Sequence, residues 1–222
     1  MNEGRAAAGS GERGCLFVLA APSGAGKTSL VNALIESEPQ LRFSVSHTTR
    51  SARRGEEDGV NYFFIERGEF AEMVAAGLFL EHAEVFDNLY GTSRVAVETL
   101  LGQGFDVLLE IDWQGAAQVR RAMPDSLSIF ILPPGRDELE RRLRSRATDS
   151  ESVIQRRLRD STSDMQHWAE FDYVIINDDF DRALAELRDV VHRGGAASRS
   201  DRPELPVIVD RLLDNSDQSS LN

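Results

Sequence analysis

The hydrophobic positions of this 222-residue chain alternate between short continuous runs and stretches with helical spacing. The run from Cys15 to Ala21 is uninterrupted and predicts a buried strand, and the spacing at 28–37 predicts a helix after it. The same pattern predicts further strands at 106–112, 127–132 and 173–176, and helices near 115–122, 137–146, 151–168 and 180–192. Strands that alternate with helices indicate an α/β fold, with a parallel sheet flanked by helices.

The segment at about 42–95 breaks this alternation. Short strands are predicted at Phe43–Ser46, Tyr62–Ile65 and Phe79–Phe86, with a short helix near 67–76. We therefore expect a small mixed α+β lobe inserted into the α/β core.

The two ends of the chain differ from the domain between them, which we place at 14–193. Residues 1–13 are rich in Gly, Ala, Arg and Glu, lack the apolar segment of a signal peptide, and predict a disordered extension. Residues 194–222 are rich in Gly, Ser and Asp and predict a mostly flexible tail, in which 207–213 could form one short helix.

Composition narrows the function classes. The chain has no apolar run of 18 residues, which argues against a membrane span, and its net charge of −12 argues against a general nucleic-acid surface. Its single cysteine, Cys15, excludes an internal disulfide and suits a cytoplasmic location. Positive charge is concentrated locally, in arginine clusters at 50–54, 141–146 and 156–159.

The only lysine of the chain, Lys27, lies in a glycine-rich loop between the first strand and the first helix. The loop consists of Ala21, Pro22, Ser23, Gly24, Ala25, Gly26, Lys27 and Thr28. It has the form of a P-loop, G-x-x-x-x-G-K-[ST], with Ala21 in place of the first Gly. A compact ammonium suits the space between two phosphoryl groups better than a planar guanidinium does.

This loop predicts a nucleotide phosphate site that binds ATP. Gly24 and Gly26 let the backbone turn its N–H groups toward an anion at a helix N-terminus. Lys27 should reach the β- and γ-phosphates, and the Thr28 hydroxyl should ligate Mg²⁺. The alternative, a glycine-rich turn without a ligand, does not account for Gly-Lys-Thr in register.

A second anion site is indicated at the start of the inserted lobe. Two arginines three residues apart, Arg50 and Arg53, lie near hydroxyl side chains and Tyr62. The alternative is a solvated basic loop. The segment resembles the GMP-binding signature of guanylate kinases, S-x-T-T-R-x-x-R-x-G-E-x-x-G-x-x-Y. The resemblance covers about 14–193 and extends to the P-loop, to 110–115, to an Arg-rich helical lid at about 141–160 and to 177–179.

The resemblance implies a role for individual residues. Arg50, Arg53, Tyr62 and Tyr90 match positions that hold the GMP phosphate, and Ser46, Glu81 and Thr92 match positions that read guanine. Arg142, Arg146 and Arg157 match lid arginines that act on the transferring phosphoryl group together with Lys27. Asp112 matches an acidic position at the nucleotide site.

The guanine assignment also makes chemical sense. Guanine presents two adjacent donors, which one carboxylate such as Glu81 accepts, whereas adenine would leave that carboxylate unpaired. Ser46 or Thr92 can donate to guanine O6. The alternatives are a surface carboxylate for Glu81 and a helix N-cap for Thr92.

Two assignments stay open. Glu110 and Asp112 end a strand and share one face, so either could point toward Mg²⁺ or guanine. The Arg-rich helices have a rival interpretation as solvated faces paired with Glu138, Glu140 and Glu151.

The resemblance implies ATP-dependent, Mg²⁺-assisted phosphorylation of GMP, and of dGMP, to the diphosphate. It implies small-molecule partners rather than nucleic acid or a membrane, in a monomer or a homo-oligomer. Two alternatives are a catalytically silent guanylate-kinase-like module that binds proteins, and a kinase for another phosphorylated acceptor. Retention of Lys27, Thr28 and the lid arginines disfavours the first, and the guanine-reading residues disfavour the second.

Overall fold

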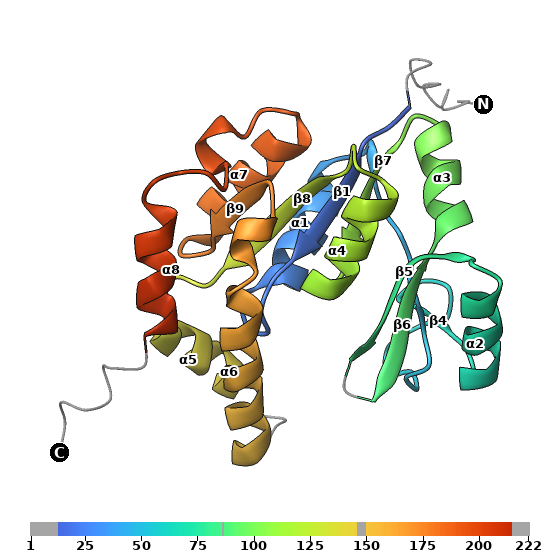
Figure 1. Ribbon diagram of the computed structural model, residues 1–222, viewed down its shortest axis with the longest axis horizontal. Coiled ribbons are helices and arrows are strands. Elements are labelled where there is room, and N and C mark those ends of the chain that lie inside the picture. The colour runs from blue at the N-terminus through green and yellow to red at the C-terminus, as the bar shows by residue number, and fades with distance from the viewer. Residues whose placement is uncertain (1–12, 86, 146–149, 215–222) are drawn as a thin grey trace, which may run out of the picture. The chain divides into compact units, whose positions relative to one another are not determined.

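The computed structural model describes residues 13–85, 87–145 and 150–214 (Figure 1). These residues form two compact units. The first unit comprises 13–17, 38–109 and 117–126, and the second comprises 18–37, 110–116 and 127–214. The predicted N-terminal extension lies outside the described residues except for its last position.

A five-stranded sheet has the strand order β2-β7-β1-β8-β9. Its strands are β1 (Leu16–Ala20), β2 (Leu41–Phe43), β7 (Asp106–Glu110), β8 (Leu127–Leu132) and β9 (Tyr173–Ile176). The β2–β7 and β8–β9 pairs are parallel. Every residue of β1 is buried, as expected of a continuous apolar run with both faces covered. The predicted α/β fold with a parallel sheet is therefore confirmed.

Helices follow the strands as the spacing of apolar residues predicts. They are α1 (Lys27–Ser37), α4 (Trp113–Ala122), α5 (Arg136–Ser145), α6 (Glu151–Met165), α7 (Phe180–Val191) and α8 (Leu205–Leu213), with 3₁₀ turns at Trp168–Glu170 and Ala196–Ser198. In the second unit α1 packs against α7, and α6 packs against both α5 and α8. Helix α7 buries Ala183, Leu187, Val190 and Val191, while Leu184 is half-buried.

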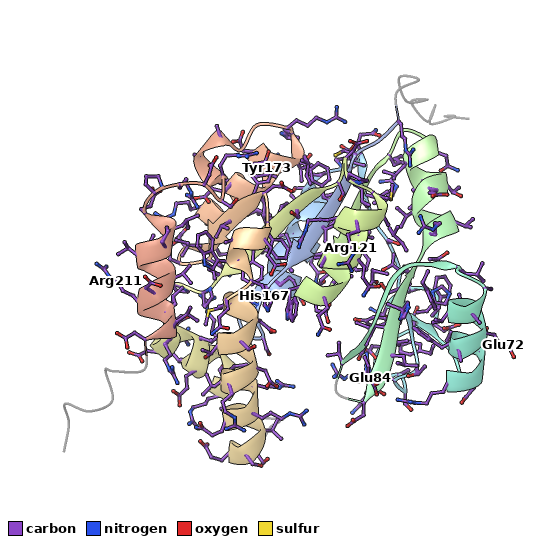
Figure 2. All side chains as sticks on the ribbon, viewed as in Figure 1. Glu72, Glu84, Arg121, His167, Tyr173 and Arg211 are labelled. Carbon is purple, nitrogen blue, oxygen red and sulfur yellow. The ribbon has the colours of Figure 1, made fainter. Side chains whose placement is uncertain are left out.

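A four-stranded sheet in the first unit has the order β4-β3-β6-β5. Its elements are β3 (His47–Thr48), β4 (Phe63–Phe64), β5 (Phe79–Val85) and β6 (Asn88–Ser93), accompanied by α2 (Arg67–Ala75) and α3 (Arg94–Gly102). Phe70 of α2 stacks on Phe79 of β5, with ring centroids 4.6 Å apart. Charged side chains such as Glu72 and Glu84 lie on the outside of this unit (Figure 2).

The sequence pattern placed two strands of this region incorrectly. The predicted strand Phe43–Ser46 is wrong except at Phe43, because β2 ends at that residue in the five-stranded sheet and β3 begins only at His47. Strand β6 was not predicted, since Asn, Gly and Ser dominate its sequence. Gly91 is required there, because a Cβ atom would lie 2.9 Å from the Phe79 ring.

The described part of the predicted tail contains the helix α8, which begins two residues before the expected range. Its Leu205, Val209 and Leu212 are buried, which explains why this segment packs in the second unit. Within the described residues, no helix is long and apolar enough to cross a membrane.

Candidate active site

The P-loop connects β1 to α1 and has the backbone geometry of an anion cradle. Gly24 and Gly26 adopt φ angles of 90° and 91°, a region that favours glycine. Among described non-glycine residues only Asp87 and Arg193 have positive φ, so the first loop position does not need glycine and Ala21 fits without strain. The substitution of Ala for Gly therefore leaves the loop intact.

Lys27 and Thr28 both meet Glu110 at the end of β7. The Thr28 hydroxyl donates to Glu110 Oε1 over 2.8 Å, and Lys27 Nζ lies 3.8 Å from the same oxygen. Lys27 Nζ also donates to the Ile111 carbonyl oxygen over 3.2 Å. A hydroxyl and a carboxylate oxygen side by side are the kind of ligand that Mg²⁺ takes alongside phosphate oxygens and water.

Asp112 faces a different partner from Glu110. Its Oδ1 accepts a hydrogen bond from the Gly115 backbone N–H over 2.7 Å, inside the first turn of α4. Asp112 belongs to the second unit, whereas the other residues expected to hold GMP belong to the first. Of the two candidate carboxylates, Glu110 is therefore the one adjacent to the Thr28 hydroxyl.

Trp113 stacks on His167, which lies just beyond the C-terminal end of α6 (Figure 2). The ring centroids are 3.5 Å apart and the planes differ by 9°. The side chain of Trp113 also hydrogen-bonds Asp164, while burial and the nearby Asp112 carboxylate raise the pKa of Asp164 to about 6. These contacts fix the start of α4, the helix that follows Glu110 and Asp112.

The described lid arginines are engaged with the second unit's own groups. Arg142 of α5 donates through Nε to Glu138 Oε1 over 2.7 Å and through Nη1 to the Ala25 carbonyl over 3.3 Å. Hydrogen bonds from Arg141 and Arg142 lower the pKa of Glu138 to about 2. Arg144 pairs with Glu140 and Glu151, as the rival interpretation of solvated ion pairs expected. Arg157 lies half-buried on α6, and Arg146 falls outside the described residues.

Among the predicted phosphate-binding residues of the first unit, two tyrosine side chains lie beside the guanidinium of Arg50. The Cζ atom of Arg50 lies 5.4 Å from the Tyr62 ring centroid, and Arg50 also hydrogen-bonds Tyr90. The Tyr62 and Tyr90 rings meet edge to face at 6.0 Å. Arg53 is exposed beside this cluster.

Glu56, for which no role was predicted, joins the two ends of the loop at 50–56, which we call the anion loop after its predicted ligand. Its two carboxylate oxygens accept from Arg50 Nη1 and Nη2 at 3.0 and 2.9 Å, and Oε2 accepts from the Arg53 backbone N–H at 2.7 Å. The hydrogen bond from Arg50 is the main cause that lowers the pKa of Glu56. Glu56 is the Glu of the Gly-Glu pair in the signature motif, and this match could have predicted that the residue contributes to the site.

The predicted guanine-reading residues form a chain of hydrogen bonds inside the first unit. Thr92 Oγ1 donates to Glu81 Oε1 over 2.6 Å, and Ser46 Oγ lies 3.4 Å from Thr92 Oγ1. Glu81 is 4% exposed and Thr92 is 0% exposed. Glu81 is thus not a surface carboxylate, and the alternative of a helix N-cap for Thr92 is wrong, because Ser93 accepts the capping hydrogen bond from Ala96 N.

The fold and the loop define a P-loop phosphate-binding protein of the α/β class. The family model described as "Guanylate kinase" matches residues 13–194. A guanylate kinase of Alkalilimnicola ehrlichii is 57% identical over 201 residues, 90% of this chain and 98% of the relative. A guanylate kinase of Escherichia coli strain K12 is 49% identical over 203 residues, with the same coverage of 90% and 98%.

The solved structures agree with these relatives. A crystal structure of guanylate kinase from Anaplasma phagocytophilum matches with a TM-score of 0.69 and 34% identity, over 90% of this chain and 95% of that one. The chain belongs to the guanylate kinase family. The resemblance inferred from the motifs is thereby confirmed.

Proposed function

We propose that this chain transfers the γ-phosphoryl group of ATP to GMP, giving ADP and GDP, with dGMP as a second acceptor. The observation that carries the proposal is the buried Ser46–Thr92–Glu81 network, found in a chain of the guanylate kinase family that also has a P-loop with Lys27 and Thr28 in register. A carboxylate held in a buried site discriminates strongly between bases, because a base without two facing donors leaves it unpaired.

The hydroxyl hydrogens assign separate roles to the two guanine-reading hydroxyls. Thr92 has one hydroxyl hydrogen and gives it to Glu81 over 2.6 Å. Thr92 therefore orients the carboxylate, and Ser46, whose contact with Thr92 is long at 3.4 Å, is the hydroxyl that turns to donate to guanine O6. Glu81 accepts from N1–H and the exocyclic amino group.

The acceptor phosphate is held by charge and hydrogen bonds from the anion loop. Arg50, fixed by Glu56, presents a guanidinium in a set orientation, and Arg53, Tyr62 and Tyr90 complete the donor set. Phosphoryl transfer of this kind needs no protein nucleophile, because positioning and charge neutralisation supply most of the catalysis.

On the donor side, the amides of the P-loop and Lys27 bind the ATP phosphates. Thr28 and Glu110 would hold Mg²⁺, which when bound neutralises phosphate charge. Mg²⁺ usually keeps several waters and takes phosphate oxygens from its substrate beside one or two protein ligands. Arg142, Arg146 and Arg157 are proposed to neutralise charge that develops on the transferring group.

Neither alternative function is favoured. A silent interaction module has no use for Lys27 and Thr28 in register with Glu110. The test is direct detection of GDP by chromatography after incubation with ATP, GMP and Mg²⁺, with EDTA as a control. We expect GDP only when Mg²⁺ is present. Binding of GMP without any GDP formed would support the silent module instead.

A further inference from the structure

Two carbonyl groups of the P-loop accept hydrogen bonds from side chains distant in sequence. The Ser23 carbonyl accepts from Ser161 Oγ of α6 at 3.1 Å. The Ala25 carbonyl accepts from Asn177 Nδ2, in the turn after β9, at 2.7 Å. Ser161 and Asn177 are buried, with 0% and 5% exposure, so neither side chain makes these bonds in competition with bulk water.

These carbonyls determine which way two backbone N–H groups point. In a planar trans peptide, the C=O of one residue and the N–H of the next are directed to opposite sides. A Ser23 carbonyl held by Ser161 therefore turns the Gly24 N–H to the opposite side, and an Ala25 carbonyl held by Asn177 does the same for the Gly26 N–H. Flexible glycines on these peptides would otherwise let them rotate.

Packing against the same side of the loop supports this arrangement. A Cβ atom at Gly26 would lie 2.3 Å from Asn177 Nδ2, so the amide of Asn177 sits directly on the loop backbone. At Gly24 a Cβ atom would lie 2.8 Å from Leu139 Cδ1 of α5. The side of the loop that carries the Ser23 and Ala25 carbonyls is thus filled by protein.

The position of Asn177 is set by the sheet rather than by the loop. Its backbone N–H donates to the Leu132 carbonyl over 2.8 Å, where β8 and β9 end side by side. Arg142 also donates to the Ala25 carbonyl, but over 3.3 Å, and it must leave this contact to act on a phosphoryl group. Arg142 Nη2 also donates to the Asn177 carbonyl over 3.1 Å, so the shorter bond to the Ala25 carbonyl comes from Asn177 Nδ2 and the longer one from Arg142.

We propose that Asn177 and Ser161 are positioning residues, which hold the P-loop peptides so that the Gly24 and Gly26 N–H groups face the donor phosphates. This inference rests on the proposed binding of ATP by the loop. It assigns the Asn of the 177–179 turn a chemical requirement: the side chain must donate to a carbonyl, which an Asp carboxylate cannot do.

The test measures ADP and GMP affinity separately, by titration calorimetry on the full chain. Asn177→Leu removes the donor at similar size without adding charge, and Asn177→Asp removes it and places an acceptor against the Ala25 carbonyl. We expect ADP affinity to fall about tenfold in Asn177→Leu and further in Asn177→Asp, in line with a buried acceptor left unsatisfied. GMP affinity, a property of the first unit, should stay within about twofold of the parent.

Ser161→Ala provides a second variant in case the Asn177 variants do not fold. It should lower ADP affinity about threefold, again without changing GMP affinity. Unchanged ADP affinity in the folded variants would overturn the inference, and so would a parallel loss of ADP and GMP affinity. A parent chain that binds no ADP would instead contradict the proposed function on which the inference rests.

Discussion

Thr92 lies directly opposite Glu81 across the β5–β6 pair, and its hydroxyl donates to the Glu81 carboxylate over 2.6 Å. The register of two antiparallel strands thus brings a donor to a carboxylate that is 4% exposed. Burial of an unprotonated carboxylate is costly unless its oxygens are hydrogen-bonded, and the proposed role of Glu81 is to accept from a base that presents two adjacent donors.

Glu81→Gln should lower kcat/KM for GMP by about 100-fold, because hydrogen bonds to charged groups contribute about 1.5–3 kcal/mol. The amide N–H₂ group of the new glutamine would also face the N–H donors of guanine. ATP affinity should not change. Steady-state kinetics with each substrate varied in turn provides the check. An equal loss toward GMP and ATP would show that Glu81 is structural.

Thr92→Val should weaken GMP use by about tenfold, because the Glu81 carboxylate loses the hydroxyl that orients it. Thr92→Ser keeps the hydroxyl and serves as the matched control, with activity close to that of the parent. If Thr92→Val and Thr92→Ser behave alike, the hydroxyl does not orient Glu81.

Glu56→Gln should lower kcat/KM for GMP by about tenfold, since the Arg50 guanidinium loses its two-point carboxylate partner. Glu57→Gln is the matched control, because Glu57 is the next residue in the chain and its side chain is exposed to solvent. Kinetics at fixed saturating ATP measures both variants. Similar losses in the two variants would mean that loop charge, rather than the Arg50 pair, matters.

Lys27→Met should reduce turnover by about 1,000-fold or more, because a single preorganised charge at a transferring phosphoryl group has an effect of this size. The fold should persist, since the side chain is partly exposed and its hydrogen bond to Ile111 and ion pair with Glu110 both lie in the loop region. Circular dichroism and GMP titration check the folded state. An active Lys27→Met enzyme would contradict the assigned role of the loop.

The first unit should lose stability at acidic pH through His47. Burial lowers the pKa of His47 in the folded chain, with Glu69 and Asp58 opposing the shift, while its ring stacks on Phe63. As the pH falls, His47 of the unfolded chain therefore binds a proton before His47 of the folded chain does. The contribution of His47 to the free energy of unfolding is fully present above about pH 6.5 and is lost as the pH drops below that value.

His47→Phe keeps an aromatic ring against Phe63 but cannot be protonated. Its unfolding free energy, measured by urea titration at several pH values, should depend less on pH between about 5 and 6.5 than that of the parent. The same pH dependence in both chains would remove His47 as the cause.

The α/β alternation and the P-loop could be predicted because each depends on local pattern. Continuous apolar runs such as that of β1 and the Gly-Lys-Thr register need no knowledge of distant residues. The lobe was harder to predict. Strand β6 contains Gly91, which looks like a breaker, and only the close approach of the Phe79 ring explains it.

The residues of the candidate site could be predicted from the sequence, but the hydrogen-bond partner of each side chain could not. Sequence spacing left Glu110 and Asp112 equivalent, since both share one strand face. Their partners distinguish them, because Glu110 meets Thr28 whereas Asp112 accepts from Gly115. Asn177 lies 152 positions from its acceptor Ala25, so no local pattern could show that bond.

The central claim is that a guanine-reading site supplies the acceptor for a P-loop kinase. The most direct measurement is a coupled ADP-release assay with ATP and Mg²⁺, comparing GMP, AMP, UMP and CMP as acceptors. We predict turnover with GMP and little or none with the other three, because only guanine offers two adjacent donors to Glu81. Turnover with AMP or a pyrimidine nucleotide at a rate similar to that with GMP would contradict the account.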